Sequence, residues 1–97
     1  MHPTTIKGFE TLEDAAKEVG KLRYDALVVF LHHLAYDFEA QQQKDMDSGK
    51  VQLAEAARFL ILELLYSRDA AEALYNLSKD HMKEELAINP ELKYPDL

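Results

Sequence analysis

The sequence predicts an all-α fold, and three observations lead to this prediction. Alanine, leucine, glutamate and lysine, which favour helices, are abundant, whereas threonine, valine and isoleucine are few. The three prolines stand at positions 3, 90 and 95, so none interrupts residues 4–89. Apolar residues recur at steps of three and four along most of that span, which is the period of an amphipathic helix. We therefore expect a small helical bundle.

The first helical block is expected to contain two helices, at about residues 11–19 and 22–46. Thr11 offers a hydroxyl that caps the first helix, and Glu13 lies in the first turn, where the helix dipole favours a carboxylate. The apolar stripe continues through Gly20. Gly20 is therefore either a left-handed residue that ends the first helix or a bend within one long helix, and we favour a bend or break.

The second block follows a turn at residues 47–49, whose sequence Asp-Ser-Gly is the clearest turn signal in the chain. We expect helices at about residues 50–66 and 69–87. Asp69, with a glutamate three residues later, resembles a capping box and indicates a new helix start. Pro90 lies just after the end of the last helix.

The expected organisation is an irregular lead-in at residues 1–10, a single helical domain at 11–88, and an extended or mobile tail at 89–97. A single core of this size needs additional stabilisation. The chain has no cysteine, which excludes disulfides and thiolate sites and leaves metal binding or association with another subunit. Two architectures fit: a four-helix unit, or a hairpin of two long helices whose dimer is a four-helix bundle.

Self-association is the first expectation, because residues 25–38 and 54–66 are apolar around nearly the whole circumference of a helix. Such helices must be buried on several sides, which one short chain can hardly provide. The expected core, shared within and between chains, consists of Leu27, Phe30, Leu31, Leu34, Phe38, Leu60, Ile61, Leu64, Leu65, Leu74 and Leu77. The expected interface consists of Leu27, Phe30, Leu31, Leu34, Phe38, Phe59, Leu62 and Tyr66.

The charge of the chain disfavours several classes of partner. Eleven basic and eighteen acidic residues give a net charge of -7, which repels nucleic-acid phosphates and anionic lipids. No apolar run approaches the ~20 residues of a membrane span, and the N-terminus does not read as a secretory signal. We expect a cytoplasmic protein that contacts neither nucleic acid nor membrane and carries no cofactor.

A metal site is the alternative interpretation. His33 and Asp37 lie four residues apart on one helical face, and His81 and Glu85 repeat this arrangement in the last helix. Two such faces brought together would present imidazoles and carboxylates to zinc, manganese or iron. The Glu-x-x-His pair of ferritin-like dinuclear sites is absent from the sequence, however. The commoner situation would be a histidine at the core margin, bonded to its carboxylate.

The leading functional hypothesis is a non-catalytic interaction or regulatory module that acts through protein–protein contacts, as a homodimer. The serines lack the glycine-flanked elbow of a hydrolase, and there is no glycine-rich phosphate cradle, so catalysis is disfavoured. The runner-up is a small metal- or ligand-binding protein that uses the two histidine and carboxylate pairs. The acidic tail also fits a short peptide ligand for a basic protein partner.

Overall fold

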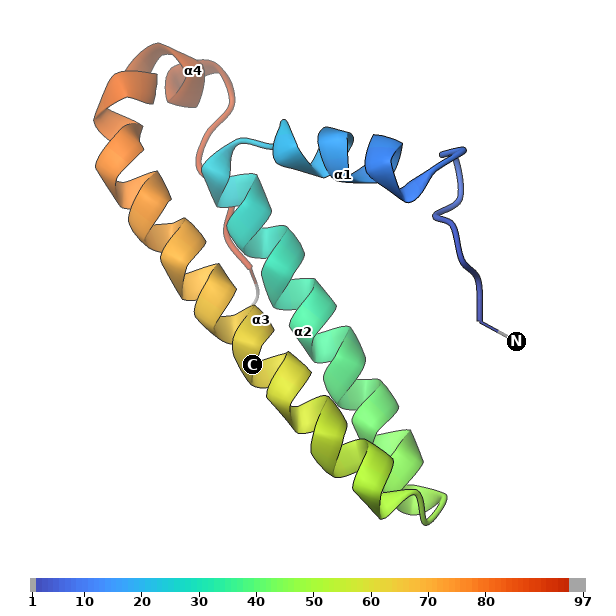
Figure 1. Cartoon of the computed structure of the whole chain (residues 1–97). Helices are drawn as coiled ribbons and strands as arrows, with labels where there is room; N and C mark the ends of the chain where they lie inside the picture. The colour runs from blue at the N-terminus through green and yellow to red at the C-terminus, as the bar shows by residue number, and fades with distance from the viewer. Residues whose placement is uncertain (1, 95–97) are drawn as a thin grey trace.

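The computed structural model describes residues 2–94, and every regular element within them is helical, so the expected all-α fold class is confirmed. The elements are α1 (Leu12–Gly20), α2 (Tyr24–Asp47), α3 (Val51–Ser78), the 3-10 helix η1 (Lys79–Met82) and α4 (Lys83–Ile88). Figure 1 shows that α2 and α3 form a long antiparallel hairpin, whereas α1 projects away from it. Residues 95–97 of the expected tail lie outside the described residues.

The seam between α2 and α3 is built from residues at alternating steps of three and four, the spacing of a two-helix contact. The buried seam residues are Asp25, Val28, His32 and Ala35 on α2, and Ala54, Ile61, Ala71 and Tyr75 on α3. Three of these eight are alanines, which let the helices approach closely but bury little apolar area. The hairpin is therefore closely packed, with only a thin core.

The turn between the two long helices confirms the prediction at residues 47–49. Gly49 adopts a left-handed φ of 81°, which a glycine reaches without steric cost. Its amide donates to the carbonyl of Met46 at 3.0 Å, and the amide of Lys50 donates to the carbonyl of Asp45 at 2.8 Å. These bonds satisfy carbonyls at the end of α2 and reverse the chain direction.

The predicted helix break between residues 66 and 69 is wrong, because α3 continues through it without interruption. Ile61, Arg68 and Tyr75 are spaced by seven residues, so Arg68 occupies a seam position where the apolar pattern seemed to lapse. Asp69, instead of capping a new helix, accepts hydrogen bonds from the guanidinium of Arg68. The predicted helix at 69–87 is likewise divided among the end of α3, η1 and α4.

The break at Gly20 is confirmed, although not by a left-handed ending. α1 begins after Thr11, whose Oγ1 accepts a hydrogen bond from the amide of Asp14 at 3.1 Å, and it ends at Gly20. Among the described residues, only Gly8 and Gly49 have positive φ. α1 also belongs to none of the packed pairs of elements, which are α2 with α3 and η1 with α3 and α4.

The protomer is more extended than a folded chain of its length. Its radius of gyration is 16.0 Å, against about 12.5 Å for a compact domain of this length. Of the residues expected in the core, Ile61 is the one buried within the chain. The rest are half-buried, as are Leu27, Leu31, Leu34, Phe38, Leu64 and Leu65, or exposed, as are Phe30, Leu60, Leu74 and Leu77.

Candidate functional site

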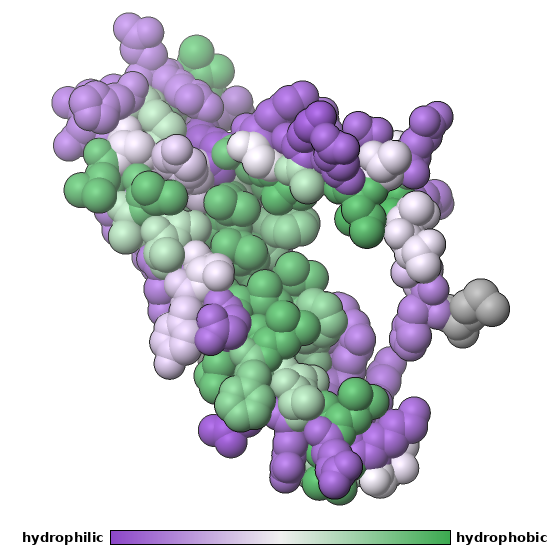
Figure 2. All heavy atoms as spheres, viewed as in Figure 1, coloured by the Kyte–Doolittle hydropathy of each residue, from purple (hydrophilic) through white to green (hydrophobic). Residues whose placement is uncertain are grey.

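One side of the hairpin carries a continuous apolar surface, which we call the open face. It consists of Leu27, Phe30, Leu31, Leu34 and Phe38 from α2, and Leu53, Ala57, Leu60, Leu64, Ser67 and Leu74 from α3. Figure 2 shows it as a band of hydrophobic residues that runs along both helices between hydrophilic ends. No charged residue belongs to this set, and Ser67 is its one polar member.

The two halves of the open face share one side because of helix direction. In each helix these residues tend to precede a seam residue by one position, as Leu27 precedes Val28 and Leu60 precedes Ile61. Since α2 and α3 run in opposite directions and face each other, the same rotation about each axis brings both stripes to the same side. The face is thus a direct product of the heptad spacing and the antiparallel hairpin.

The open face leaves large side chains in solvent. The exposed fractions are 41% for Phe30, 56% for Leu53, 45% for Leu60 and 49% for Leu74. Among residues 2–94, no further helix covers these side chains, because α1 projects beyond the hairpin (Figure 1). In folded proteins, large contiguous apolar surfaces are characteristic of interaction sites, so the open face is the candidate site of this chain.

The expected interface residues fall into two groups. The five expected interface residues that belong to α2, from Leu27 to Phe38, all lie on the open face. Phe59, Leu62 and Tyr66 point away from it on α3, because Phe59 lies about 100° before Leu60 and Leu62 follows the seam residue Ile61. Phe59 and Tyr66 are 71% and 66% exposed, so α3 is apolar on two sides.

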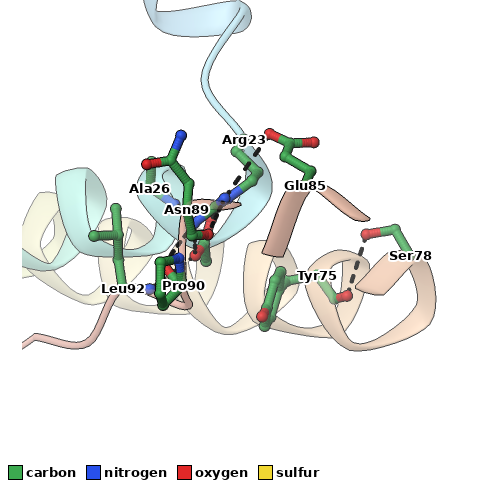
Figure 3. A network of polar contacts seen from close by, with 9 residues as sticks. Arg23, Ala26, Tyr75, Ser78, Glu85, Asn89, Pro90 and Leu92 are labelled. Carbon is green, nitrogen blue, oxygen red and sulfur yellow. Dashed lines mark hydrogen bonds and ion pairs between the residues drawn. The ribbon is translucent and has the colours of Figure 1, made fainter. Parts of the chain in front are cut away.

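The opposite side of the hairpin is covered by the C-terminal segment at residues 89–94. Arg23 holds this segment by donating to the carbonyl of Asn89 at 2.7 Å and to that of Pro90 at 3.0 Å (Figure 3). Asp25 accepts the amide of Leu92 at 2.9 Å. The bonds go to the backbone of the segment, so they fix its path and not its side chains.

Arg23 and Asp25 themselves form a nearly buried ion pair. The guanidinium donates to both carboxylate oxygens, at 2.7 and 2.8 Å. Burial acts to raise the pKa of Asp25, but the hydrogen bonds from Arg23 and from the amides of Leu92 and Ala26 outweigh it and hold the pKa below its usual value. Asp25 is therefore ionised, and its charge is fully compensated.

His32 is the buried histidine of the chain, whereas His33 is exposed, so the expectation of a histidine at the core margin was one residue out of register. The ring of His32 stacks on that of Tyr94, with the two ring centroids 4.1 Å apart. Nδ1 lies 3.1 Å from a guanidinium nitrogen of Arg68. Because arginine only donates, Nδ1 accepts and the proton of the neutral ring is on Nε2.

The surroundings of His32 oppose its protonation. Burial lowers its pKa, and the positive charges of Arg68 and His33 lower it further. Nε2 is buried and has no hydrogen-bond partner among residues 2–94. A charged ring here would be desolvated beside the guanidinium of Arg68, so this environment favours the neutral form of His32.

A cavity of about 280 Å³ lies where α3 meets the C-terminal segment. Its walls include Glu72 and Tyr75 of α3, Asp25 of α2, and Glu91 of the segment. Burial raises the pKa of Tyr75, and the carboxylates of Glu91 and Asp25 add to the effect. The hydroxyl of Tyr75 therefore stays neutral beside these carboxylates.

The residues of the predicted metal site are not assembled into a cluster. His33 and Asp37 are exposed on α2, and the Asp37 carboxylate accepts a hydrogen bond from the Gln41 amide at 2.8 Å. His81 lies in η1 and Glu85 in α4, both exposed at one end of the molecule. Nowhere in residues 2–94 do three His, Cys, Asp or Glu side chains gather as metal ligands would.

Comparisons with known proteins leave the open face as the main guide to function. No protein-family model, curated protein or solved structure matches the chain. Within residues 2–94, no helix combines the length and the apolarity that crossing a membrane demands.

Proposed function

We propose that this protein is a non-catalytic helical interaction module that acts as a homodimer through the open face. The observation that carries the proposal is the uncharged apolar surface along both long helices. Polar and charged groups are depleted in the centre of stable interfaces, as they are here. Two hairpins stacked on this face form a four-helix bundle, a common solution for paired helical hairpins.

The exposed area of the protomer supports a second copy as the occupant. The accessible surface is 7745 Å², whereas a folded monomer of 11.1 kDa exposes about 5,700 Å². The excess is therefore about 2,000 Å², and a standard interface buries about 800 Å² per partner. One protomer thus has ample surplus surface for a homodimer, and for a second protein partner at other exposed sites such as Phe59 and Tyr66.

Sedimentation equilibrium tests the proposal directly. We expect a mass of twice the 11.1 kDa chain at micromolar concentration. Leu34→Asp, which introduces a charge into the middle of the open face, should return the protein to monomer or unfold it. A wild-type protein that sediments as a monomer at all concentrations tested, while circular dichroism shows it fully helical, overturns the proposal.

A further inference from the structure

Within residues 2–94 the projecting helix α1 makes no extensive contact with another helix, although Ala15 is buried and Val19 is half-buried. Leu12, Ala15, Ala16 and Val19 recur at steps of three and four and form one apolar stripe. Leu12 is nevertheless 56% exposed. The charged residues of α1 lie elsewhere on its surface, including Lys17, which is paired with Glu13 at 3.1 Å.

A helix of this length does not hold itself together. Isolated helices shorter than ~12–15 residues are marginal in water, and α1 has nine residues. The Thr11 cap and the pairs Glu13–Lys17 and Glu18–Lys21 assist it, but each contributes too little to replace a packed face. The part of the stripe that is still exposed, around Leu12 and Ala16, therefore lacks a tertiary contact within residues 2–94.

We propose that α1 is exchanged in the dimer, so that α1 of each protomer packs its apolar stripe against the hairpin of the other, at or beside the open face. This inference depends on the proposed homodimer and specifies how the two copies hold each other. Figure 1 shows α1 leaving the hairpin at the start of α2, which carries the helix beyond the edge of its own protomer. Its apolar stripe and the uncharged open face are chemically matched.

The surface excess is consistent with exchange as well as with stacking. Hairpin stacking at the size of a standard interface uses about 800 Å² of the ~2,000 Å² excess per protomer. The remainder includes the apolar surface of α1 and of the lead-in, where Ile6 is 51% exposed. A second copy that accepts α1 would bury these residues, whereas a simple stack of hairpins leaves them in solvent.

A photo-crosslink from α1 tests the proposal in the full-length chain. Because the sequence contains no cysteine, Lys17→Cys, on the polar side of α1, provides a single attachment point for a benzophenone maleimide and leaves the apolar stripe intact. We expect irradiation to produce a covalent dimer, with the crosslinked peptide in residues 27–38 or 53–74. Mixing isotopically labelled and unlabelled chains identifies the crosslink as one between protomers.

The outcomes separate this proposal from the homodimer itself. A dimer by sedimentation that gives only crosslinks within one chain, or none, overturns the exchange of α1 and leaves the homodimer intact. A protein that is monomeric by sedimentation overturns both.

A matched pair of substitutions gives a second measurement. Leu12→Ala should weaken the dimer between about tenfold and a hundredfold, because the exposed part of Leu12 loses its buried contact twice per dimer. Lys17→Ala, on the polar side of the same helix, should leave the dissociation constant unchanged. Equal dissociation constants for Leu12→Ala and the wild type contradict the exchange.

Discussion

The substitution Leu60→Ala measures how much the open face contributes to association. Leu60 is 45% exposed in the protomer. Its three carbons beyond Cβ are worth about 0.8 kcal/mol each on full burial. The part still exposed therefore corresponds to about 1.1 kcal/mol per protomer. Two-fold symmetry places the residue in the interface twice, so the dimer should lose about 2.2 kcal/mol, or roughly fortyfold in dissociation constant.

Phe59→Ala is the control for this experiment, since Phe59 is adjacent in sequence and more exposed than Leu60, at 71%, but lies off the open face. Analytical ultracentrifugation over a dilution series gives both dissociation constants, and circular dichroism checks that α3 remains folded. We expect the control to match the wild type. If Phe59→Ala weakens association as much as Leu60→Ala, the interface lies elsewhere on α3 and the reasoning from the seam is refuted.

Three further predictions concern the hairpin and its C-terminal segment. Acidification should release residues 89–94, because the pKa of His32 lies below its usual 6.5 in the folded state, so its stabilising effect is complete above pH 6.5 and is lost as the pH falls through the folded pKa. The protection of this segment from hydrogen exchange, relative to the intrinsic exchange rate at each pH, should fall on acidification, and His32→Phe should remove the part of that fall that begins near pH 6.5. Asp25→Asn should lower the free energy of unfolding by about 3 kcal/mol, because it leaves Arg23 without its buried partner; an unchanged urea midpoint would contradict this role. Gly49→Ala should lower the free energy of unfolding by about 1 kcal/mol, because alanine is strained at positive φ. Gly20→Ala, at a helical residue with open space around it, should instead stabilise α1 by about 0.5–1 kcal/mol. The midpoint of thermal unfolding should therefore fall for Gly49→Ala, and helix content by circular dichroism should rise for Gly20→Ala.

Much of the hairpin could be predicted from the sequence, because it depends on local turn and capping signals. The turn at 47–49 has a glycine where a left-handed residue is needed, and Thr11 caps α1 as its hydroxyl and position indicate. The break at Ser67 was mispredicted because a charged residue, Arg68, occupies a seam position. Its partner, His32, lies 36 residues away, and local pattern does not reveal such a distant pair.

The C-terminal segment was the least predictable part of the fold. Arg23 and Asp25 read as members of a mixed charged cluster, and nothing in their spacing indicates that they bind backbone groups of residues 89–92. Their partners are main-chain amides and carbonyls, which every residue carries and which therefore leave no sequence signal. The apolar surplus of residues 25–38, by contrast, was visible in the sequence, because excess hydrophobicity depends on composition and not on a particular partner.

The thin seam explains why the two sides of the hairpin differ so much. On one side, Arg23, Asp25 and His32 recruit the chain's own C-terminal segment, so polar groups there are satisfied within the protomer. Within the described part of the chain, residues 2–94, the other side has no such groups and no covering segment. Because the seam consists largely of alanines and polar residues, it provides little of the apolar burial that offsets the entropy of ordering two long helices. In the homodimer that we propose, burial of the open face would supply that missing stability, and folding would be coupled to association.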